Sequence, residues 1–160
     1  MPISSRQDEN FMRLAIAKAR QGVAKGQTPF GAVIVYRGKP VAAAHNQVWR
    51  RTDITAHAEM TALRQACRRL KTLHLSGATV YSTCEPCPMC LSACHWARIG
   101  RIVYGASISD AAGFGFNELR ISNQTMLRLG KSRIRLAPGV LRGDCLQVFG
   151  EWKRKHPKAY

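Results

Sequence analysis

The chain has 160 residues, 46% hydrophobic and 21% charged, a balance that excludes a disordered or fibrous protein and a length that suits one domain. No charge-free apolar run reaches the roughly 18 residues of a membrane-spanning helix, and residues 1–9 do not resemble a signal peptide, so a cytoplasmic protein is expected. The 25 basic and 9 acidic residues give a net charge of +16, which makes nucleic acid or another acidic partner a candidate.

The first part of the chain predicts a helix followed by a hairpin. Apolar side chains recur at the spacing of an amphipathic helix in Met12, Ala15, Ile16, Ala19 and Val23. Two apolar runs, 30–36 and 41–44, are then separated by Arg37-Gly38-Lys39-Pro40. This pattern is typical of two buried strands joined by a turn.

The rest of the chain predicts alternating helices and strands. A second helix is expected to start near Thr55 as its N-cap, with its apolar face marked by Met60, Leu63, Cys67 and Leu70. A strand at 79–83, a helix at 86–98 and a strand at 102–106 predict a right-handed parallel crossover. Apolar residues from Cys145 to Trp152 indicate a last helix. We therefore expect one domain, 1–160, with a three-layer α/β/α sandwich around a central mixed sheet.

Two short segments carry the residue types of a zinc site. They are Thr55-Ala56-His57-Ala58-Glu59 and Cys84-Glu85-Pro86-Cys87-Pro88-Met89-Cys90. Cys87 and Cys90 are three residues apart at a helix start, so they face the same way and their thiolate forms are favoured. Together with His57 they supply three ligands for one Zn²⁺ and leave the fourth tetrahedral position open to water. Water bound there can ionise near neutral pH and act as a nucleophile.

Glu59 is the expected proton shuttle and catalytic residue. Side chains in the first turn of a helix lean toward its N-terminus, so His57 and Glu59 can both reach a metal at the helix tip. A carboxylate beside the activated water can take its proton and pass it to a leaving amine. The pairing of H-x-E with P-C-x-x-C is a signature of zinc deaminases.

The same cysteines leave two other classes of protein open. The C-x2-C-x2-C-x3-C spacing of a bacterial ferredoxin is met by Cys84, Cys87, Cys90 and Cys94. An iron–sulfur electron-transfer protein is therefore an alternative. Against it, Cys94 is followed by His95 and not by Pro, no second run supplies a companion cluster, and His57 and Glu59 are left without a task. A zinc module that binds RNA without catalysis is the third hypothesis.

These motifs resemble the cytidine and deoxycytidylate deaminase superfamily, and in particular its bacterial guanine deaminase branch. That branch is known for zinc-dependent hydrolysis of guanine to xanthine and ammonia. The resemblance covers most of the chain, through residues 28–35, 55–59, 84–89, 96–98, 109–112, 115–118 and 159–160. Close relatives that deaminate adenosine in tRNA share the zinc motifs, but they tend to have Val in place of Phe30 and Leu in place of Cys84. The resemblance favours guanine, with tRNA adenosine, guanosine or another aminated base as alternatives.

The resemblance also implies residues that contact the substrate. Asn46 would hydrogen-bond it, while Phe30 and Trp96 would supply aromatic walls. Glu118 would accept hydrogen bonds from N–H groups of guanine, although Asn117 stands where the branch often has Asp. Each position also has an ordinary structural explanation. Asn46 suits a turn, Phe30 and Trp96 suit packed positions, and Glu118 suits a solvated loop.

Two further substrate contacts and a homodimer complete these expectations. Ala58, between the His and the Glu of the first motif, is one contact, and Tyr160 is the other. By the resemblance, the segment of about 141–160 is expected to cross to a partner subunit and bring Tyr160 to its active site. An ordinary basic tail is the alternative. The remaining thiols are expected to pack as small apolar side chains: Cys67, Cys84, Cys94 and Cys145.

Overall fold

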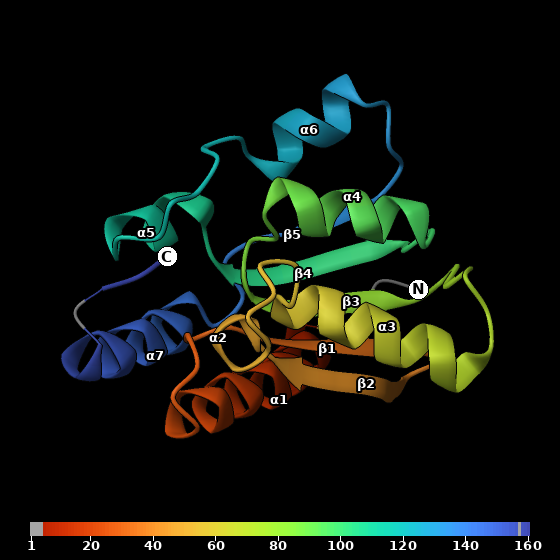
Figure 1. Cartoon of the computed structure of the whole chain (residues 1–160). Helices are drawn as coiled ribbons and strands as arrows, with labels where there is room; N and C mark the ends of the chain where they lie inside the picture. Colours follow the sequence, from red (N-terminus) through yellow and green to blue (C-terminus); the bar gives the residue numbers. More distant parts are fainter. Residues whose placement is uncertain (1–4, 157) are drawn as a thin grey trace.

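A five-stranded sheet lies at the centre of the protein, between two layers of helices (Figure 1). The computed structural model describes residues 5–156 and 158–160. Its helices are α1 (Ser5–Ala24), α2 (Val48–Arg51), α3 (Ala58–Leu70), α4 (Pro88–Trp96), α5 (Ile108–Gly113), α6 (Asn123–Leu129) and α7 (Arg142–Lys155). Its strands are β1 (Gly31–Tyr36), β2 (Lys39–His45), β3 (Thr79–Cys84), β4 (Arg101–Ala106) and β5 (Arg135–Ala137). Among the described residues, no helix is long and apolar enough to cross a membrane.

The sheet is mixed, as the sequence predicts. Its strand order is β2-β1-β3-β4-β5, with β1 antiparallel to both β2 and β3. β3 and β4 are parallel and are connected through α4, and β5 extends the parallel part. The parallel pairing puts the ends of β3 and β4 at the same edge of the sheet, where the loops before α4 and α5 meet.

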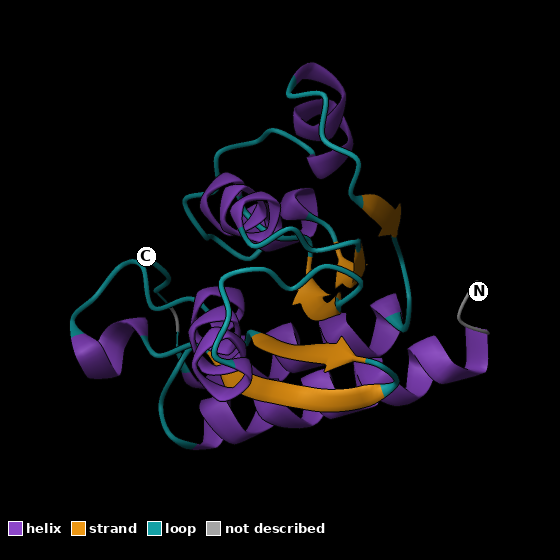
Figure 2. Ribbon diagram, turned by 90° about the vertical axis from the view of Figure 1, so that its right-hand side faces the viewer, coloured by secondary structure: helices purple, strands orange, loops and turns teal. Residues whose placement is uncertain are grey.

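The two faces of the sheet bury separate apolar layers. Figure 2 shows helices on both sides of the sheet. Along β1, Ala32 and Ile34 pack on the side of α3 and α4, whereas Val33 and Val35 pack on the side of α1 and α7. Successive side chains of a strand point to opposite faces of the sheet, which explains this alternation. A strand that is buried on both faces therefore needs apolar residues at every position, as β1 has. At Gly31 the helix α1 comes so near that a Cβ would lie 2.1 Å from the Ala15 carbonyl oxygen.

A buried ion pair ties the start of α1 to the sheet. Arg101, at the beginning of β4, donates two hydrogen bonds of 2.7 Å to the carboxylate of Asp8. The hydroxyl of Tyr81 in β3 donates to the same carboxylate at 2.9 Å. Because three hydrogen bonds from two residues reach this acceptor, the Asp8 charge is compensated although its side chain is buried.

Two helices begin later than the sequence predicts. The second predicted helix begins at Ala58 and not near Thr55, because Thr55 is held in a turn by hydrogen bonds to the Asp53 carboxylate. The expected helix from residue 86 begins at Pro88, since proline is favoured in the first helical position. The sequence analysis also did not anticipate four short elements: α2, α5, α6 and β5.

Candidate active site

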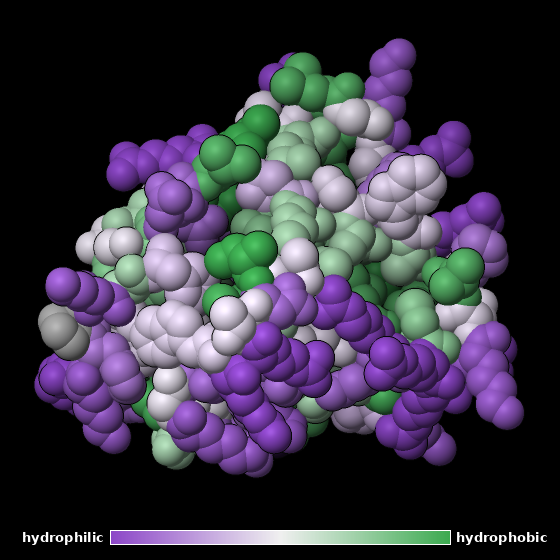
Figure 3. All heavy atoms as spheres, viewed as in Figure 1, coloured by the Kyte–Doolittle hydropathy of each residue, from purple (hydrophilic) through white to green (hydrophobic). Residues whose placement is uncertain are grey.

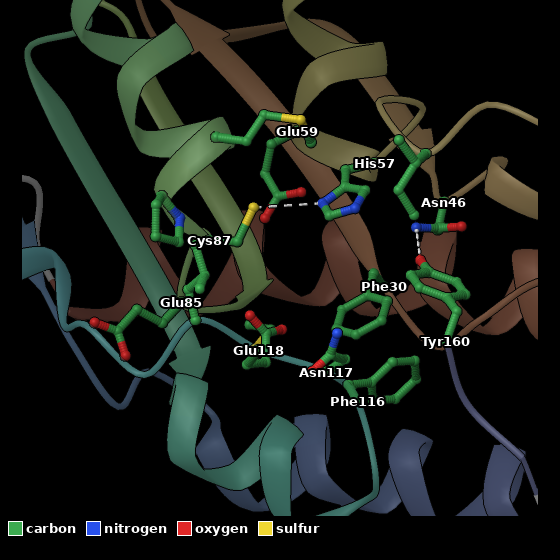
Figure 4. A pocket seen from close by; sticks show the side chains of 15 residues that line it. Phe30, Asn46, His57, Glu59, Glu85, Cys87, Phe116, Asn117, Glu118 and Tyr160 are labelled. Carbon is green, nitrogen blue, oxygen red and sulfur yellow. Dashed lines mark hydrogen bonds between the residues drawn. The ribbon is translucent and has the colours of Figure 1, made fainter.

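The predicted metal ligands meet where two helices begin. His57 is the N-cap of α3 and Cys87 is the N-cap of α4, and neither side chain makes a capping hydrogen bond. Both side chains instead turn toward each other, with His57 Nδ1 3.5 Å from Cys87 Sγ and 3.6 Å from Cys90 Sγ (Figure 4). Among the described residues, His57, Cys87 and Cys90 form a group whose ligand atoms all lie within 4.8 Å of one another.

This geometry and its donor chemistry fit zinc. Zinc–nitrogen and zinc–sulfur bonds at a tetrahedral ion place neighbouring ligand atoms about 3.5 Å apart, which agrees with the distances between His57 and the two thiols. Hydrogen bonds from Cys90 and His57 lower the pKa of Cys87 to about 4, so this thiol takes the form that binds metals. When bound there, zinc supplies the activation of a water molecule for nucleophilic attack.

Glu59 stands beside these ligands in the first turn of α3. Its side chain is buried, with one oxygen accepting a 3.0 Å hydrogen bond from the Ser82 hydroxyl and the other 3.6 Å from Cys90 Sγ. Burial raises the pKa of the Glu59 carboxyl above its ordinary value. A raised pKa makes the carboxylate a better proton acceptor, and taking and returning a proton is the task expected of Glu59.

A pocket of about 310 Å³ opens in front of the metal ligands. Its volume is at the lower end for small-molecule sites in proteins, as a single base requires. The lining comes from segments that are far apart in the sequence: Phe30, Asn46, Ile54, His57, Glu59, Cys84, Glu85, Cys87, Pro88, Met89, Phe116, Asn117, Glu118, Leu119 and Tyr160.

One wall of the pocket contains Asn46, which is buried at the end of β2. Its side-chain oxygen accepts a 3.0 Å hydrogen bond from the Val48 amide, and its Nδ2 donates to the Tyr160 hydroxyl at 2.7 Å. Because the amide oxygen is engaged in the turn and one Nδ2 hydrogen in the bond to Tyr160, Asn46 has one N–H left to donate in the pocket. Asn46 therefore both stabilises the turn after β2 and lines the pocket.

The tail reaches the same wall within its own chain. The Tyr160 ring lies edge-on to Phe116 and Trp49, with centroid distances of 5.7 and 6.0 Å. Phe116 in turn stacks on Trp152 of α7, which is fully buried. Burial raises the pKa of Tyr160 to about 12, so its hydroxyl stays protonated. The contact expected from a partner subunit is thus made here by the chain's own Tyr160.

Glu118 belongs to the opposite wall, in the loop between α5 and α6. Figure 4 shows Glu118 between Glu85 on one side and Phe30 on the other. Burial, reinforced by the negative charges of Cys87 and Glu59, raises the pKa of Glu118 to about 7. A solvated loop acid would keep its ordinary pKa, so the environment of Glu118 is that of a site residue.

Two predicted substrate contacts are not among the residues that line the pocket. The side chain of Trp96 is 82% exposed at the end of α4. Ala58 is fully buried and packs in the core layer beneath α3. Phe30, by contrast, does line the pocket, and its ring is edge-on to Phe116 at 4.9 Å.

The four cysteines of the ferredoxin spacing do not converge. Cys94 is buried in the apolar layer beneath α3 and α4, whereas Cys84 belongs to the layer on the other face of the sheet. Two separate layers cannot present these thiols to one iron–sulfur cluster, so that alternative is wrong. Cys84, Cys94 and Cys145 are buried as expected, while Cys67 is half-buried.

The sequence analysis gave no role to three residues that complete the site. Ser82 donates a hydrogen bond to Glu59, and Phe116 lies between Tyr160 and Phe30. Glu85 lines the pocket beside residues 86–90, the metal turn, which carries Cys87 and Cys90. A serine inside a strand of buried residues was a usable signal, because a buried hydroxyl needs a partner. Phe116 gave no such signal, since the residues around it in the sequence do not show which of the two apolar layers it joins.

Comparison with known proteins assigns the family. The family described as cytidine and deoxycytidylate deaminase zinc-binding region matches residues 5–106. Guanine deaminase of Bacillus subtilis (strain 168) is 46% identical over 111 residues, covering 69% of this chain and 71% of that protein. The tRNA-specific adenosine deaminase of the same organism is 36% identical over 156 residues, covering 96% and 94%. A solved structure of guanine deaminase from Nitrosomonas europaea superposes with a TM-score of 0.85 at 28% identity, covering 91% and 84%.

The family match includes both zinc motifs, and the structure brings their His and Cys ligands together beside a buried Glu. The fold is likewise shared with the solved relatives over nearly the whole chain. The chain therefore belongs to the cytidine and deoxycytidylate deaminase family and is a zinc-dependent hydrolytic deaminase.

Proposed function

We propose that this deaminase hydrolyses guanine to xanthine and ammonia. The observation that supports guanine is the polarity of the two pocket walls. Asn46 offers the N–H that is not bonded to Tyr160 on one wall, and the Glu118 carboxylate offers an acceptor on the other. A base that fits both walls needs an acceptor and an N–H donor besides the amine that leaves.

Guanine meets this requirement, and the base of adenosine in tRNA does not. After its 2-amino group is directed to the metal, guanine still has a ring N–H as donor and a carbonyl oxygen as acceptor. Adenosine in tRNA has N9 bonded to the ribose, so once its amino group is directed to the metal the base retains only ring nitrogens that accept hydrogen bonds. Glu118 would then face acceptors only, and the half-buried carboxylate would gain no hydrogen bond from the base.

The decisive experiment is a panel of substrates in which ammonia release is measured. The panel contains guanine, guanosine, adenine, cytosine, cytidine and a tRNA anticodon stem-loop, with Glu59→Gln as the inactive control. We expect turnover of guanine above all other members. Ammonia released from the stem-loop alone would overturn the proposal, and RNA binding without any turnover would favour the non-catalytic zinc module.

Adenosine in tRNA is the second candidate substrate. It is favoured by the net charge of +16 and by the tRNA-specific relative that aligns over nearly the whole chain. On the face drawn in Figure 3, hydrophilic side chains gather over α3, where Arg68 and Arg69 are exposed. Such a surface attracts a polyanion regardless of what the pocket accepts. The stem-loop in the panel separates this candidate from guanine.

We also propose a homodimer in which the segment of about 141–160 is exchanged. Within its own chain the Tyr160 hydroxyl lies 3.3 Å from the Thr28 hydroxyl as well as 2.7 Å from Asn46 Nδ2. In the exchanged arrangement Tyr160 would make these contacts in the partner subunit's pocket. Deletion of residues 157–160 should preserve zinc and the dimer but raise KM several-fold, because the pocket loses its cover. An unchanged rate and KM would make the segment an ordinary tail.

Mixed dimers test the exchange itself. Glu59→Gln chains have an intact tail, and chains lacking 157–160 have an intact Glu59. If the tail crosses, mixing the two restores a complete site and the wild-type KM. If each tail serves its own chain, the mixture shows only the raised KM of the shortened chain.

A further inference from the structure

Glu85 occupies an unusual position between the metal turn and two helix starts. It follows β3, two residues before Cys87, and its side chain is buried. One carboxylate oxygen accepts a 3.0 Å hydrogen bond from the Ile108 amide, and the other accepts one of 2.8 Å from the Asn123 amide. Ile108 and Asn123 are the first residues of α5 and α6. A single side chain thus joins three segments of the chain.

The segment between these two amides carries one wall of the pocket. Phe116, Asn117, Glu118 and Leu119 all lie between Ile108 and Asn123 and line the cavity. Apart from the two helical ends, this segment has little regular structure of its own. Fixing both of its ends therefore limits where Glu118 can lie relative to Cys87.

A return contact makes this junction specific. The Asn123 side chain donates a 2.6 Å hydrogen bond to the Pro86 carbonyl oxygen, beside Glu85 in the metal turn. The start of α6 is thus bonded to the metal turn twice. The Asn123 amide donates to the Glu85 side chain, and the Asn123 side chain donates to the Pro86 main chain. Such reciprocal bonds fix orientation as well as distance.

We propose that Glu85 is a positioning residue that sets Glu118 against the metal turn and so determines substrate affinity. The effect acts through Glu118 and rests on the proposed role of that residue in binding guanine. The inference assigns Glu85 no part in the proton transfer. Removing Glu85 should weaken binding while leaving the metal ligands and the chemical step in place.

A carboxylate suits this junction because it has two acceptor oxygens. Glu85→Gln keeps the shape but replaces one oxygen by an NH₂ group, which would face an N–H donor. One of the two buried amides then loses its partner. We expect KM for guanine to rise about tenfold, with kcat within about threefold and zinc content unchanged.

Hydrogen exchange supplies a readout that does not depend on the substrate. In Glu85→Gln, the amide of Ile108 or of Asn123, whichever lacks its acceptor, should exchange faster than in the wild type. Asp110→Asn is the matched control. Asp110 caps α5 through Ser107 and pairs with Arg142, but it does not reach α6. The control should leave KM and the exchange at Asn123 unchanged.

Ile108→Pro tests the same bond from the other side. Proline is tolerated at the first helical position and removes the donor while Glu85 stays in place. It should reproduce the rise in KM, and it serves if Glu85→Gln does not fold. Unchanged KM and exchange, or loss of zinc together with kcat, would overturn the proposal. If the wild-type protein does not use guanine, only the guanine proposal fails. The role of Glu85 is then decided by hydrogen exchange and by KM for the substrate that the panel identifies.

Discussion

The metal centre and the substrate walls of this deaminase are built in contrasting ways. The metal ligands and Glu59 come from two short segments, 57–59 and 87–90, at the starts of two helices. The walls are assembled from residues as distant as Phe30 and Tyr160. The chemical machinery is therefore local in the sequence, whereas selectivity depends on tertiary packing. Changes at the metal centre should abolish catalysis, and changes in the walls should alter only which base is used and how tightly.

The largest effect is expected from the metal ligands. Cys87→Ala and Cys90→Ala each remove a thiolate, so both the zinc content and the activity should fall to background. Zinc measured by atomic absorption alongside ammonia release provides the check. Cys67→Ala, outside the site, is the matched control and should retain both. Activity without zinc would contradict this account of the centre.

Glu59→Gln separates metal binding from proton transfer. The amide cannot take a proton, so turnover should drop at least about 10²–10⁴-fold, the usual range for general acid–base catalysis. Zinc content should stay at the wild-type level, because Glu59 is not a ligand. Equal metal with near wild-type turnover would remove Glu59 from the mechanism.

A smaller, pH-dependent effect is expected at Glu118. With a pKa of about 7, its carboxylate accepts hydrogen bonds only above that pH, so affinity for guanine should fall as the pH drops below 7. Glu118→Gln should raise KM about tenfold at pH 8 and flatten this dependence. KM measured from pH 5.5 to 8.5 for both proteins gives the comparison. Parallel profiles would show that Glu118 is not the titrating group.

The smallest effect is expected from salt. Guanine is neutral, so its turnover should change little with ionic strength, whereas binding of RNA to a protein of charge +16 falls steeply. A titration from 50 to 500 mM salt, chosen to span about a threefold change in Debye length, measures both. A steep loss of turnover on the preferred substrate would point to a polyanion.

The difference between the two regions also explains what the sequence could predict. Cys87 and Cys90 were identified from their spacing, because helix geometry fixes how nearby residues face, and His57 from the H-x-E motif that accompanies such a pair in zinc deaminases. The placement of Tyr160 in the pocket depends on Trp152 and Phe116, which come together only in the folded core. Resemblance to the family supplied Tyr160, and periodicity could not have done so.

Local signals were weakest in short elements. The helices α5 and α6 contain too few residues to show an apolar period, although each begins with a serine cap that the sequence displays. Trp96 illustrates the opposite case. It is a large aromatic residue, of a type usually expected in a core or a pocket, but its side chain is exposed at the end of α4. Its place could not be inferred from the helix pattern, because the pattern does not say which face meets solvent.

The capping positions of α3 and α4 have a consequence for how this protein depends on its surroundings. His57 and Cys87 stand where a Ser, Thr or Asp would ordinarily satisfy free amides, and each helix forgoes about 1 kcal/mol of stabilisation by leaving its cap unmade. An ion that binds the folded chain and not the unfolded one returns about 2.7 kcal/mol when its free concentration is a hundredfold above Kd. The folding equilibrium is thereby linked to metal supply. Chains made under zinc starvation should be degraded faster than chains made with zinc present.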